Sequence, residues 1–162
     1  MKTYWHTDKP EGVLSYAFAE SNYGTMLVAW VHNRLCYLGF TDSLDDIEQR
    51  WPKAKLSEAD GRYGLVINEG QHPPMALYGT PFEHKVWLEL MNIPKGKTCS
   101  YGELAAAIGK PMAQRAVASA IGRNPISLLV PCHRVLRSSG ALGGYHWGLE
   151  IKRQLLAAEN KN

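Results

Sequence analysis

Cysteine is scarce in this chain, and its distribution excludes two classes of small protein. Three cysteines occur among the 162 residues, at Cys36, Cys99 and Cys132, and no two of them are close in sequence. An odd number of widely spaced cysteines argues against a disulfide scaffold and is typical of a reducing cytoplasm. No CxxC or HxxxH pair offers ready-made metal ligands, so we expect neither zinc nor another metal.

Long apolar runs are also missing. No window approaches the roughly 18 apolar residues of a membrane span, and the residues after Met1 have no apolar stretch of the signal-peptide kind. Hydrophobic residues make up 45% and charged residues 20% of the chain, a composition that excludes a disordered polymer. The sequence therefore predicts a globular cytoplasmic protein that does not enter a membrane.

Charge of one sign is in small excess, but it is unevenly distributed. The formal net charge is +3, and acidic residues such as Asp42, Asp45 and Asp46 gather in the first half. The basic residues from position 95 onward that have few acidic neighbours are Lys95, Lys97, Lys110, Arg115, Arg123, Arg134, Arg137, Lys152 and Arg153. This asymmetry is compatible with binding to a polyanion, although charge alone does not establish it.

The first half of the chain is typical of a small sheet. Residues 12–40 contain an alternating segment around Leu14, Tyr16 and Phe18 and two short apolar runs, separated by turn-forming residues. A helix is predicted over residues 42–51 with Ser43 as its N-cap, and residues 52–80 look irregular, with a linker at 72–75. We expect an α+β protein whose N-terminal lobe, residues 1–76, is a small antiparallel sheet with one or two helices.

The second half, residues 77–162, has helical signals. Thr80 and Pro81 begin one helix, and a capping box from Ser100 to Glu103 opens another. After a tight turn at 109–111, residues 112–122 predict a further helix of mostly small side chains that carries Arg115. Two short helices across such a turn outline a helix-turn-helix, but helix pairs also pack in ordinary cores, and small side chains suit close packing as well as a narrow DNA groove.

A candidate nucleophile follows. Residues 128–130 predict a short buried strand that leads into Pro131, Cys132, His133 and Arg134. Pro131 fixes the entry to a turn, and the two cationic neighbours favour the thiolate form of Cys132. Most lone cysteines are inert core residues, so spacing alone leaves both a nucleophile and a structural cysteine open.

The pentapeptide Pro-Cys-His-Arg-Val at residues 131–135 is the hallmark of the O6-alkylguanine-DNA alkyltransferases, or methylated-DNA–protein-cysteine methyltransferases, and the chain closely resembles their bacterial members. Ordered matches run from residue 80 to Glu159, whereas residues 1–79 match only in pattern. The resemblance implies a ribonuclease H-like N-terminal lobe and a C-terminal DNA-binding domain, residues 77–162, in which a helix-turn-helix carries the active site.

The resemblance also implies a reaction and its participants. Cys132 would accept the alkyl group irreversibly and without a cofactor, while Glu159 orients His133, which reaches the cysteine through a water. Tyr101 would donate a proton to guanine N3, and Asn124 would brace the turn. From the residues alone, Tyr101 could instead cap its helix and Glu159 could be a surface charge.

Further residues are implied to hold the substrate, which is double-stranded DNA containing O6-alkylguanine and bound by a monomer. Arg115 would fill the gap left by the flipped base, with the helix over 112–123 in the minor groove. Phosphate contacts are implied for Ser138 and for the backbone near Gly102 and Lys110. The substrate pocket would comprise Pro131, Val135, Tyr145 and His146.

Three other functions compete with this interpretation. An alkyltransferase-like lesion sensor would lack the acceptor cysteine, which is present here as Cys132. A helix-turn-helix transcription factor would not need the pentapeptide. A cysteine hydrolase would need an oxyanion hole and would turn over repeatedly.

Overall fold

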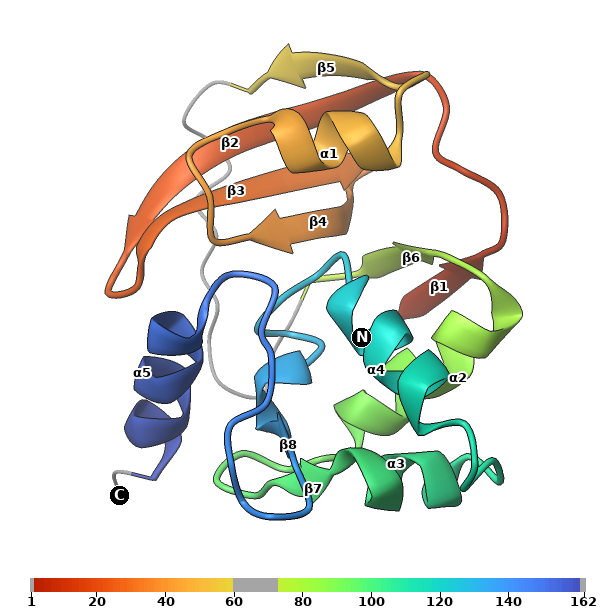
Figure 1. Cartoon of the computed structure of the whole chain (residues 1–162). Coiled ribbons are helices and arrows are strands. Elements are labelled where there is room, and N and C mark those ends of the chain that lie inside the picture. The colour runs from red at the N-terminus through yellow and green to blue at the C-terminus, as the bar shows by residue number, and fades with distance from the viewer. Residues whose placement is uncertain (1, 60–72, 161–162) are drawn as a thin grey trace. The chain divides into compact units, whose positions relative to one another are not determined.

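The computed structural model describes residues 2–59 and 73–160, and the chain divides into two compact units, Met1–Thr80 and Pro81–Asn162 (Figure 1). The division therefore falls four residues later than the boundary expected after residue 76. The reason is a strand, Met75–Tyr78, which belongs to the sheet of the first unit. Of the expected linker at 72–75, residue 72 lies outside the described part.

The first unit is built on a six-stranded sheet. Its centre is an antiparallel meander, as predicted, in which the two-residue turn before Arg34 has positive φ at both His32 (50°) and Asn33 (63°), the geometry that suits a tight hairpin. In sheet order the strands are β1 (Thr3–His6), β6 (Met75–Tyr78), β4 (Arg34–Gly39), β3 (Gly24–Val31), β2 (Val13–Ser21) and β5 (Lys55–Glu58).

The expectation of an antiparallel sheet is confirmed for β2, β3 and β4 and is wrong for the other strands. The strand pairs β1–β6, β4–β6 and β2–β5 are parallel. Each of β1, β5 and β6 has only four residues, and each pairs with a strand that no hairpin connects to it, so no turn signal marks them. The sheet is therefore mixed, and the segment expected to be irregular contributes two of its strands.

The helix of the first unit is shorter than predicted. α1 spans Asp45–Arg50, and its N-cap is Leu44, which makes no side-chain cap. Ser43 lies one residue earlier, where its hydroxyl accepts a hydrogen bond from the Asp45 N–H at 3.1 Å. None of the helices in the described part of the chain is long and apolar enough to span a bilayer.

The second unit is helical, as predicted, with a small parallel two-stranded sheet. The capping box is confirmed: Ser100 Oγ accepts from the Glu103 N–H at 3.0 Å, and the Glu103 carboxylate accepts from the Ser100 N–H at 3.3 Å. The buried Trp87 indole donates to the Ala120 carbonyl at 2.9 Å and so joins two helices. The elements are α2 (Pro81–Met91), β7 (Cys99–Ser100), α3 (Tyr101–Ala107), α4 (Gln114–Gly122), η1 (Cys132–Arg134), β8 (Val135–Leu136) and α5 (Leu149–Glu159).

The strand predicted over residues 128–130 is also wrong. The chain turns there: Leu128 has φ +75°, and the Val130 N–H donates to the Ile126 carbonyl at 3.0 Å. These residues form a turn and not a strand, because the side-chain amide of Asn124 hydrogen-bonds the backbone of Ile126 and Val130 in place of a neighbouring strand. That turn delivers the chain to η1 and to Cys132.

Candidate active site

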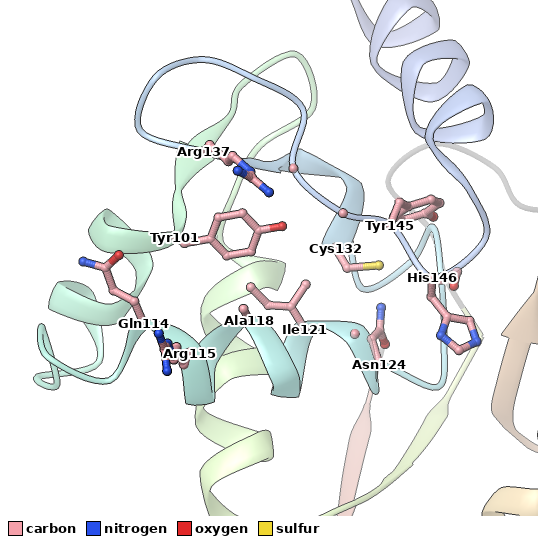
Figure 2. A pocket seen from close by; sticks show the side chains of 14 residues that line it. Tyr101, Gln114, Arg115, Ala118, Ile121, Asn124, Cys132, Arg137, Tyr145 and His146 are labelled. Atoms are coloured by element: carbon pink, nitrogen blue, oxygen red, sulfur yellow. The ribbon is translucent and has the colours of Figure 1, made fainter.

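Cys132 opens the short helix η1 and faces a cavity of about 440 Å³ in the C-terminal unit (Figure 2). Its side chain is only 6% exposed. The residues that line the cavity are Tyr101, Gln114, Arg115, Ala118, Ile121, Gly122, Asn124, Ser127, Cys132, Arg137, Gly143, Gly144, Tyr145 and His146. A single buried thiol thus lies at the wall of a chamber large enough for a small organic group.

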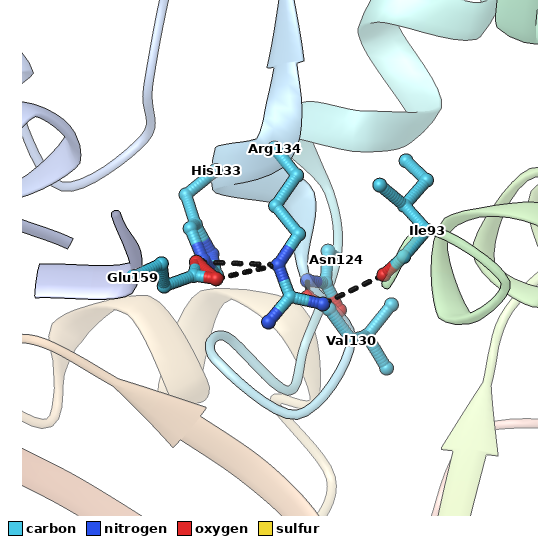
Figure 3. Close-up of polar contacts among 6 residues, drawn as sticks. All are labelled: Ile93, Asn124, Val130, His133, Arg134 and Glu159. Carbon is cyan, nitrogen blue, oxygen red and sulfur yellow. Dashed lines mark hydrogen bonds and ion pairs between the residues drawn. The ribbon is translucent and has the colours of Figure 1, made fainter. Parts of the chain in front are cut away.

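Asn124 builds the turn that positions the thiol. Its Nδ2 donates to the Val130 carbonyl at 2.8 Å (both residues are drawn in Figure 3), and its Oδ1 accepts from the Ile126 N–H at 3.0 Å. The amide is buried, so both of these hydrogen bonds are made away from water, where they are hardest to replace. The same side chain hydrogen-bonds the thiol of Cys132. Asn124 therefore ties the backbone of the turn and the reactive group to one point.

Lys152, on α5, fixes the opposite side of the site. Its side chain is fully buried, and its ammonium donates to the carbonyls of Val135 (2.7 Å), Leu142 (2.5 Å) and Gly144 (3.1 Å). These three acceptors match the three N–H donors of an ammonium group. One lysine thus connects α5 with β8 and with the loop that closes the cavity.

The environment of Cys132 leaves the thiol protonated at rest. Burial raises the pKa of Cys132, and the hydrogen bonds of Asn124 and Tyr145 and the charge of Lys152 lower it without cancelling the effect of burial. The Tyr145 hydroxyl is itself buried and meets full hydrogen-bond geometry with no described residue, Cys132 included, so it acts on the thiol as a nearby donor. Burial lowers the pKa of Lys152 to about 8, against a smaller raising effect of Cys132. A base is therefore needed to produce the thiolate.

A histidine–carboxylate pair begins at the residue that follows Cys132 in η1. His133 Nε2 hydrogen-bonds Glu159, and the histidine is 1% exposed (Figure 3). The other ring nitrogen, Nδ1, is buried and has no hydrogen-bond partner among the described residues. Because Glu159 holds Nε2, the pair presents Nδ1 as the nitrogen able to take up a proton.

Glu159 is shared between His133 and Arg134. The Arg134 guanidinium donates through Nε to both carboxylate oxygens, at 2.8 Å and 3.2 Å, and through Nη1 to the Ile93 carbonyl at 2.7 Å. Burial raises the pKa of Glu159, but the hydrogen bonds and charges of His133 and Arg134 outweigh it and lower the pKa overall. The carboxylate therefore stays ionised beside His133.

The expectation that His133 and Arg134 themselves favour the thiolate needs correction. The groups that lower the pKa of Cys132 are Asn124, Tyr145 and Lys152. Residues 132–134 form a 3-10 turn, and this turn directs Arg134 toward Glu159 instead of the thiol. Arg134 is close to Cys132 in sequence, but its charge is paired with Glu159 and does not act on the thiol.

Tyr101 forms another wall of the cavity at the start of α3. Gly143 makes its position possible, because a Cβ on Gly143 would lie 3.1 Å from the Tyr101 hydroxyl. Burial raises the pKa of Tyr101, the charge of Arg137 lowers it and that of Cys132 raises it. The phenol is therefore a neutral proton donor that points into the chamber (Figure 2).

Helix α4 presents small side chains to solvent. Ala116, Ala118 and Ser119 are exposed, as is Arg115, whereas Ala120 is buried against α2. Of the two readings of this helix, close packing accounts for Ala120 and leaves the other small residues without a packing role. The exposed face of α4 therefore consists of small side chains and of Arg115, which lies at the cavity.

The structure brings together only part of the set expected from sequence. Cys132, Asn124, Tyr101, Arg115, Tyr145 and His146 line the cavity, whereas His133 and Glu159 pair with each other outside its lining. Pro131 and Val135 are buried outside the cavity lining, and the Val135 carbonyl already accepts from Lys152. The residues expected to contact phosphate, Gly102, Lys110 and Ser138, also lie outside the cavity lining. The backbone N–H of Lys110 already donates to the Ala105 carbonyl at 2.9 Å.

Two residues with evident roles in the site were not assigned by the sequence. Lys152 looks like one of several surface charges on an amphipathic helix, and only its burial reveals its function. Arg137 follows the pentapeptide closely and lines the cavity. Its position in the basic second half was the only sequence signal that could have indicated it.

The fold and the site together define a protein with a cysteine-centred reactive site in a helical DNA-binding unit, since the family described as "6-O-methylguanine DNA methyltransferase, DNA binding domain" matches residues 81–161. The methylated-DNA–protein-cysteine methyltransferase of Methanosarcina barkeri is 51% identical over 154 residues, which cover 91% of this chain and 98% of that protein. The chain belongs to the methylated-DNA–protein-cysteine methyltransferase family.

Two further relatives extend the comparison. The bifunctional transcriptional activator/DNA repair enzyme Ada of Escherichia coli is 40% identical over 161 residues, covering 91% of this chain and 46% of that protein. This chain thus spans about half the length of several curated relatives that it matches. The crystal structure of Mycobacterium tuberculosis OGT in complex with DNA superposes with a TM-score of 0.74 at 36% identity, covering 90% of this chain and 92% of that one.

Proposed function

We propose that this protein repairs O6-alkylguanine in double-stranded DNA by transferring the alkyl group irreversibly to Cys132. One observation carries the proposal: the buried thiol of Cys132 faces a cavity of about 440 Å³, and the next residue in η1, His133, is hydrogen-bonded to Glu159. A nucleophile next to a base that a third group orients is the arrangement that covalent chemistry needs. O4-alkylthymine is a second substrate that this chemistry allows.

The proposed reaction moves two protons and one alkyl group. The thiol proton of Cys132 passes through a bridging water to Nδ1 of His133, whose positive charge Glu159 stabilises. The thiolate attacks the alkyl carbon, so that a C–S bond forms while the C–O bond breaks and its electron pair goes to the guanine ring. Tyr101 then gives its phenolic proton to guanine N3. The thioether has no easy route back, so each molecule acts once and needs no cofactor.

DNA binding is proposed for α3 and α4 as a helix-turn-helix. A stacked base cannot present its O6 substituent to a buried thiol, so the nucleotide must be rotated out of the duplex. The exposed small side chains of α4 suit the narrow minor groove, and Arg115 lies at the cavity, where it would fill the vacated place in the stack. Phosphate contacts of Ser138 and of the backbone near Gly102 and Lys110 would hold the DNA backbone.

The setting of the reaction is proposed in the same terms. We place the protein in the cytoplasm as a monomer, with a ribonuclease H-like N-terminal lobe. The antiparallel meander of β2, β3 and β4, extended by the parallel strand β6 beside β4, supports that likeness.

The test is mass spectrometry of the protein after incubation with an O6-methylguanine oligonucleotide. We expect the peptide that contains Cys132 to gain the mass of one methyl group, with one methyl per protein molecule. The Cys99→Ala variant is the matched control and should still accept the methyl group, whereas Cys132→Ala should not. Repaired DNA beside an unmodified Cys132 would contradict the proposal, and lesion binding without transfer would favour a sensor instead.

A further inference from the structure

The arginines of the described residues divide into two groups by the partners of their side chains. Most of them contact a carboxylate or an aromatic ring: Arg34 lies over the Tyr4 ring, Arg50 pairs with Asp46, Arg123 with Glu83, Arg134 with Glu159 and Arg153 with Glu150. Within the described ranges, Arg115 and Arg137 are the arginines whose guanidinium groups have no hydrogen bond, ion pair or ring contact. Both line the cavity.

The backbone of Arg137 is held firmly although its side chain is exposed. Its N–H donates to the Ala141 carbonyl at 2.9 Å, and its carbonyl accepts from the Gly140 N–H at 2.8 Å. Arg137 directly follows β8, whose preceding residues lead back to Cys132. The side chain therefore starts from a fixed point close to the reactive centre.

The stem of Arg137 points along the cavity wall. A Cβ on Gly143 would lie 3.5 Å from Arg137 Cγ and 3.1 Å from the Tyr101 hydroxyl, so Gly143 lets the arginine stem and the phenol pack on one loop. In Figure 2 Arg137 and Tyr101 lie at the same end of the cavity, while Arg115 comes from α4. No residue that lines the cavity, in the part of the chain that the structure describes, is acidic.

We propose that Arg137 binds a phosphodiester that flanks the extruded nucleotide. A base that enters the cavity brings its two adjacent phosphates to the entrance, and an unpaired guanidinium at that place can bind a phosphate with two parallel hydrogen bonds. Arg115 and Arg137 then have separate tasks, the first in the base stack and the second on the backbone. This inference rests on the proposed function and adds a binding site to it.

The first experiment measures equilibrium binding of O6-methylguanine duplex in the Cys132→Ala background at several salt concentrations. Replacing one phosphate contact should make the slope of log K against log salt shallower by about 0.9. We expect this change for Arg137→Gln and a retained slope for Arg137→Lys, which keeps the charge. Arg153→Gln, which removes an exposed arginine paired with Glu150, is the matched control and should leave the slope unchanged.

The second experiment locates the phosphate. Each of the two phosphates that flank the lesion is replaced in turn by a neutral methylphosphonate. At one of them, the replacement should weaken binding of the protein with Arg137 roughly tenfold and leave binding of Arg137→Gln nearly unchanged, because the two changes remove the same contact. Equal losses for both proteins at both phosphates, or equal salt slopes, would overturn the inference.

A third comparison uses free O6-methylguanine, which has no phosphate, as the methyl donor to the protein with Cys132 intact. Arg137→Gln should reduce transfer from DNA roughly tenfold more than transfer from the free base. An equal reduction for both donors would place Arg137 in the chemistry of Tyr101 and overturn the phosphate assignment. Absence of methyl transfer in the unaltered protein would overturn the proposed function, while the binding experiments would still decide the role of Arg137.

Discussion

The buried ammonium of Lys152 lowers the pKa of the Cys132 thiol through its charge while it donates to three backbone carbonyls. A single side chain therefore both shapes the loop over the cavity and acts on the nucleophile. Burial in turn lowers the pKa of Lys152 to about 8 from its ordinary value of 10.5. The protonation of Lys152 should therefore make the free energy of unfolding depend on pH.

The first prediction concerns stability at alkaline pH. Between pH 8 and 10.5 the unfolded chain holds a proton on Lys152 that the folded protein has lost, so the free energy of unfolding should rise with pH in this window. Relative to Lys152→Met, the protein should gain about 1–3 kcal/mol across it. Urea denaturation of both proteins at several pH values measures the difference. A difference that stays flat or falls would show that the lysine remains charged.

The second prediction concerns the base. His133→Gln should slow single-turnover methyl transfer at neutral pH by roughly a hundredfold or more, because general-base catalysis is lost and the buried thiol stays protonated. The rate of the variant should recover as pH rises and hydroxide ionises Cys132 directly. Rapid-quench measurements between pH 6 and 10 give both profiles. Parallel profiles for the two proteins would remove His133 from the reaction.

The third prediction concerns the carboxylate behind the histidine. Because the pKa of Glu159 is lowered in the folded protein, its contribution to stability is present above its ordinary value of 4.5 and is lost as pH falls through the lowered value. Glu159→Gln should remove this acid-dependent loss. Thermal unfolding followed from pH 7 to 3 checks it, with Glu150→Gln, at an exposed carboxylate paired with Arg153, as the control. If Glu159→Gln lost the same stability at acid pH as the unaltered protein, the loss would come from another group.

The fourth prediction concerns the loop beside Tyr101. Gly143 has φ +70°, and a Cβ there would lie 3.1 Å from the Tyr101 hydroxyl; Gly140 has φ +87° with nothing within 4 Å. Gly143→Ala and Gly140→Ala should each lower the free energy of unfolding by about 1 kcal/mol through backbone strain. Only Gly143→Ala should also slow methyl transfer, by displacing the phenol. Equal transfer rates in the two variants would argue against a role for the Tyr101 position.

The fifth prediction concerns base flipping. Arg115→Ala should slow transfer from a duplex more than transfer from single-stranded DNA, by roughly tenfold in the ratio, because a stacked and paired base costs more to extrude. Single-turnover rates on the two substrates supply that ratio, and Arg153→Ala serves as the matched exposed arginine. An unchanged ratio would count against Arg115 as the residue that fills the stack.

Local signals predicted those parts of the fold in which a short motif fixes the backbone. The capping box of Ser100 and Glu103 and the helix start at Pro81 are confirmed, because each depends on neighbouring residues alone. The sequence did not predict the parallel pairings of the four-residue strands β1, β5 and β6, because these pairings depend on partners far away in sequence.

The site was predicted through its resemblance to a family more than through residue spacing. The apolar residues 128–130 have the composition of a strand, and only the two hydrogen bonds of Asn124 make them a turn. Lys152 lies between the charged residues Glu150 and Arg153, so no local sequence pattern predicts that it is buried. Its position depends on a loop closing over α5, and loop closure is a property of the whole unit.

The burial of Cys132 has a consequence for the lifetime of an unused molecule. Peroxides and disulfides attack thiolates far faster than thiols, and they need access to the sulfur. A sulfur that is 6% exposed and held in its protonated form by burial is poorly reachable by such oxidants. If the protein reacts only once, as proposed, this protection of the thiol preserves its full repair capacity until damaged DNA arrives.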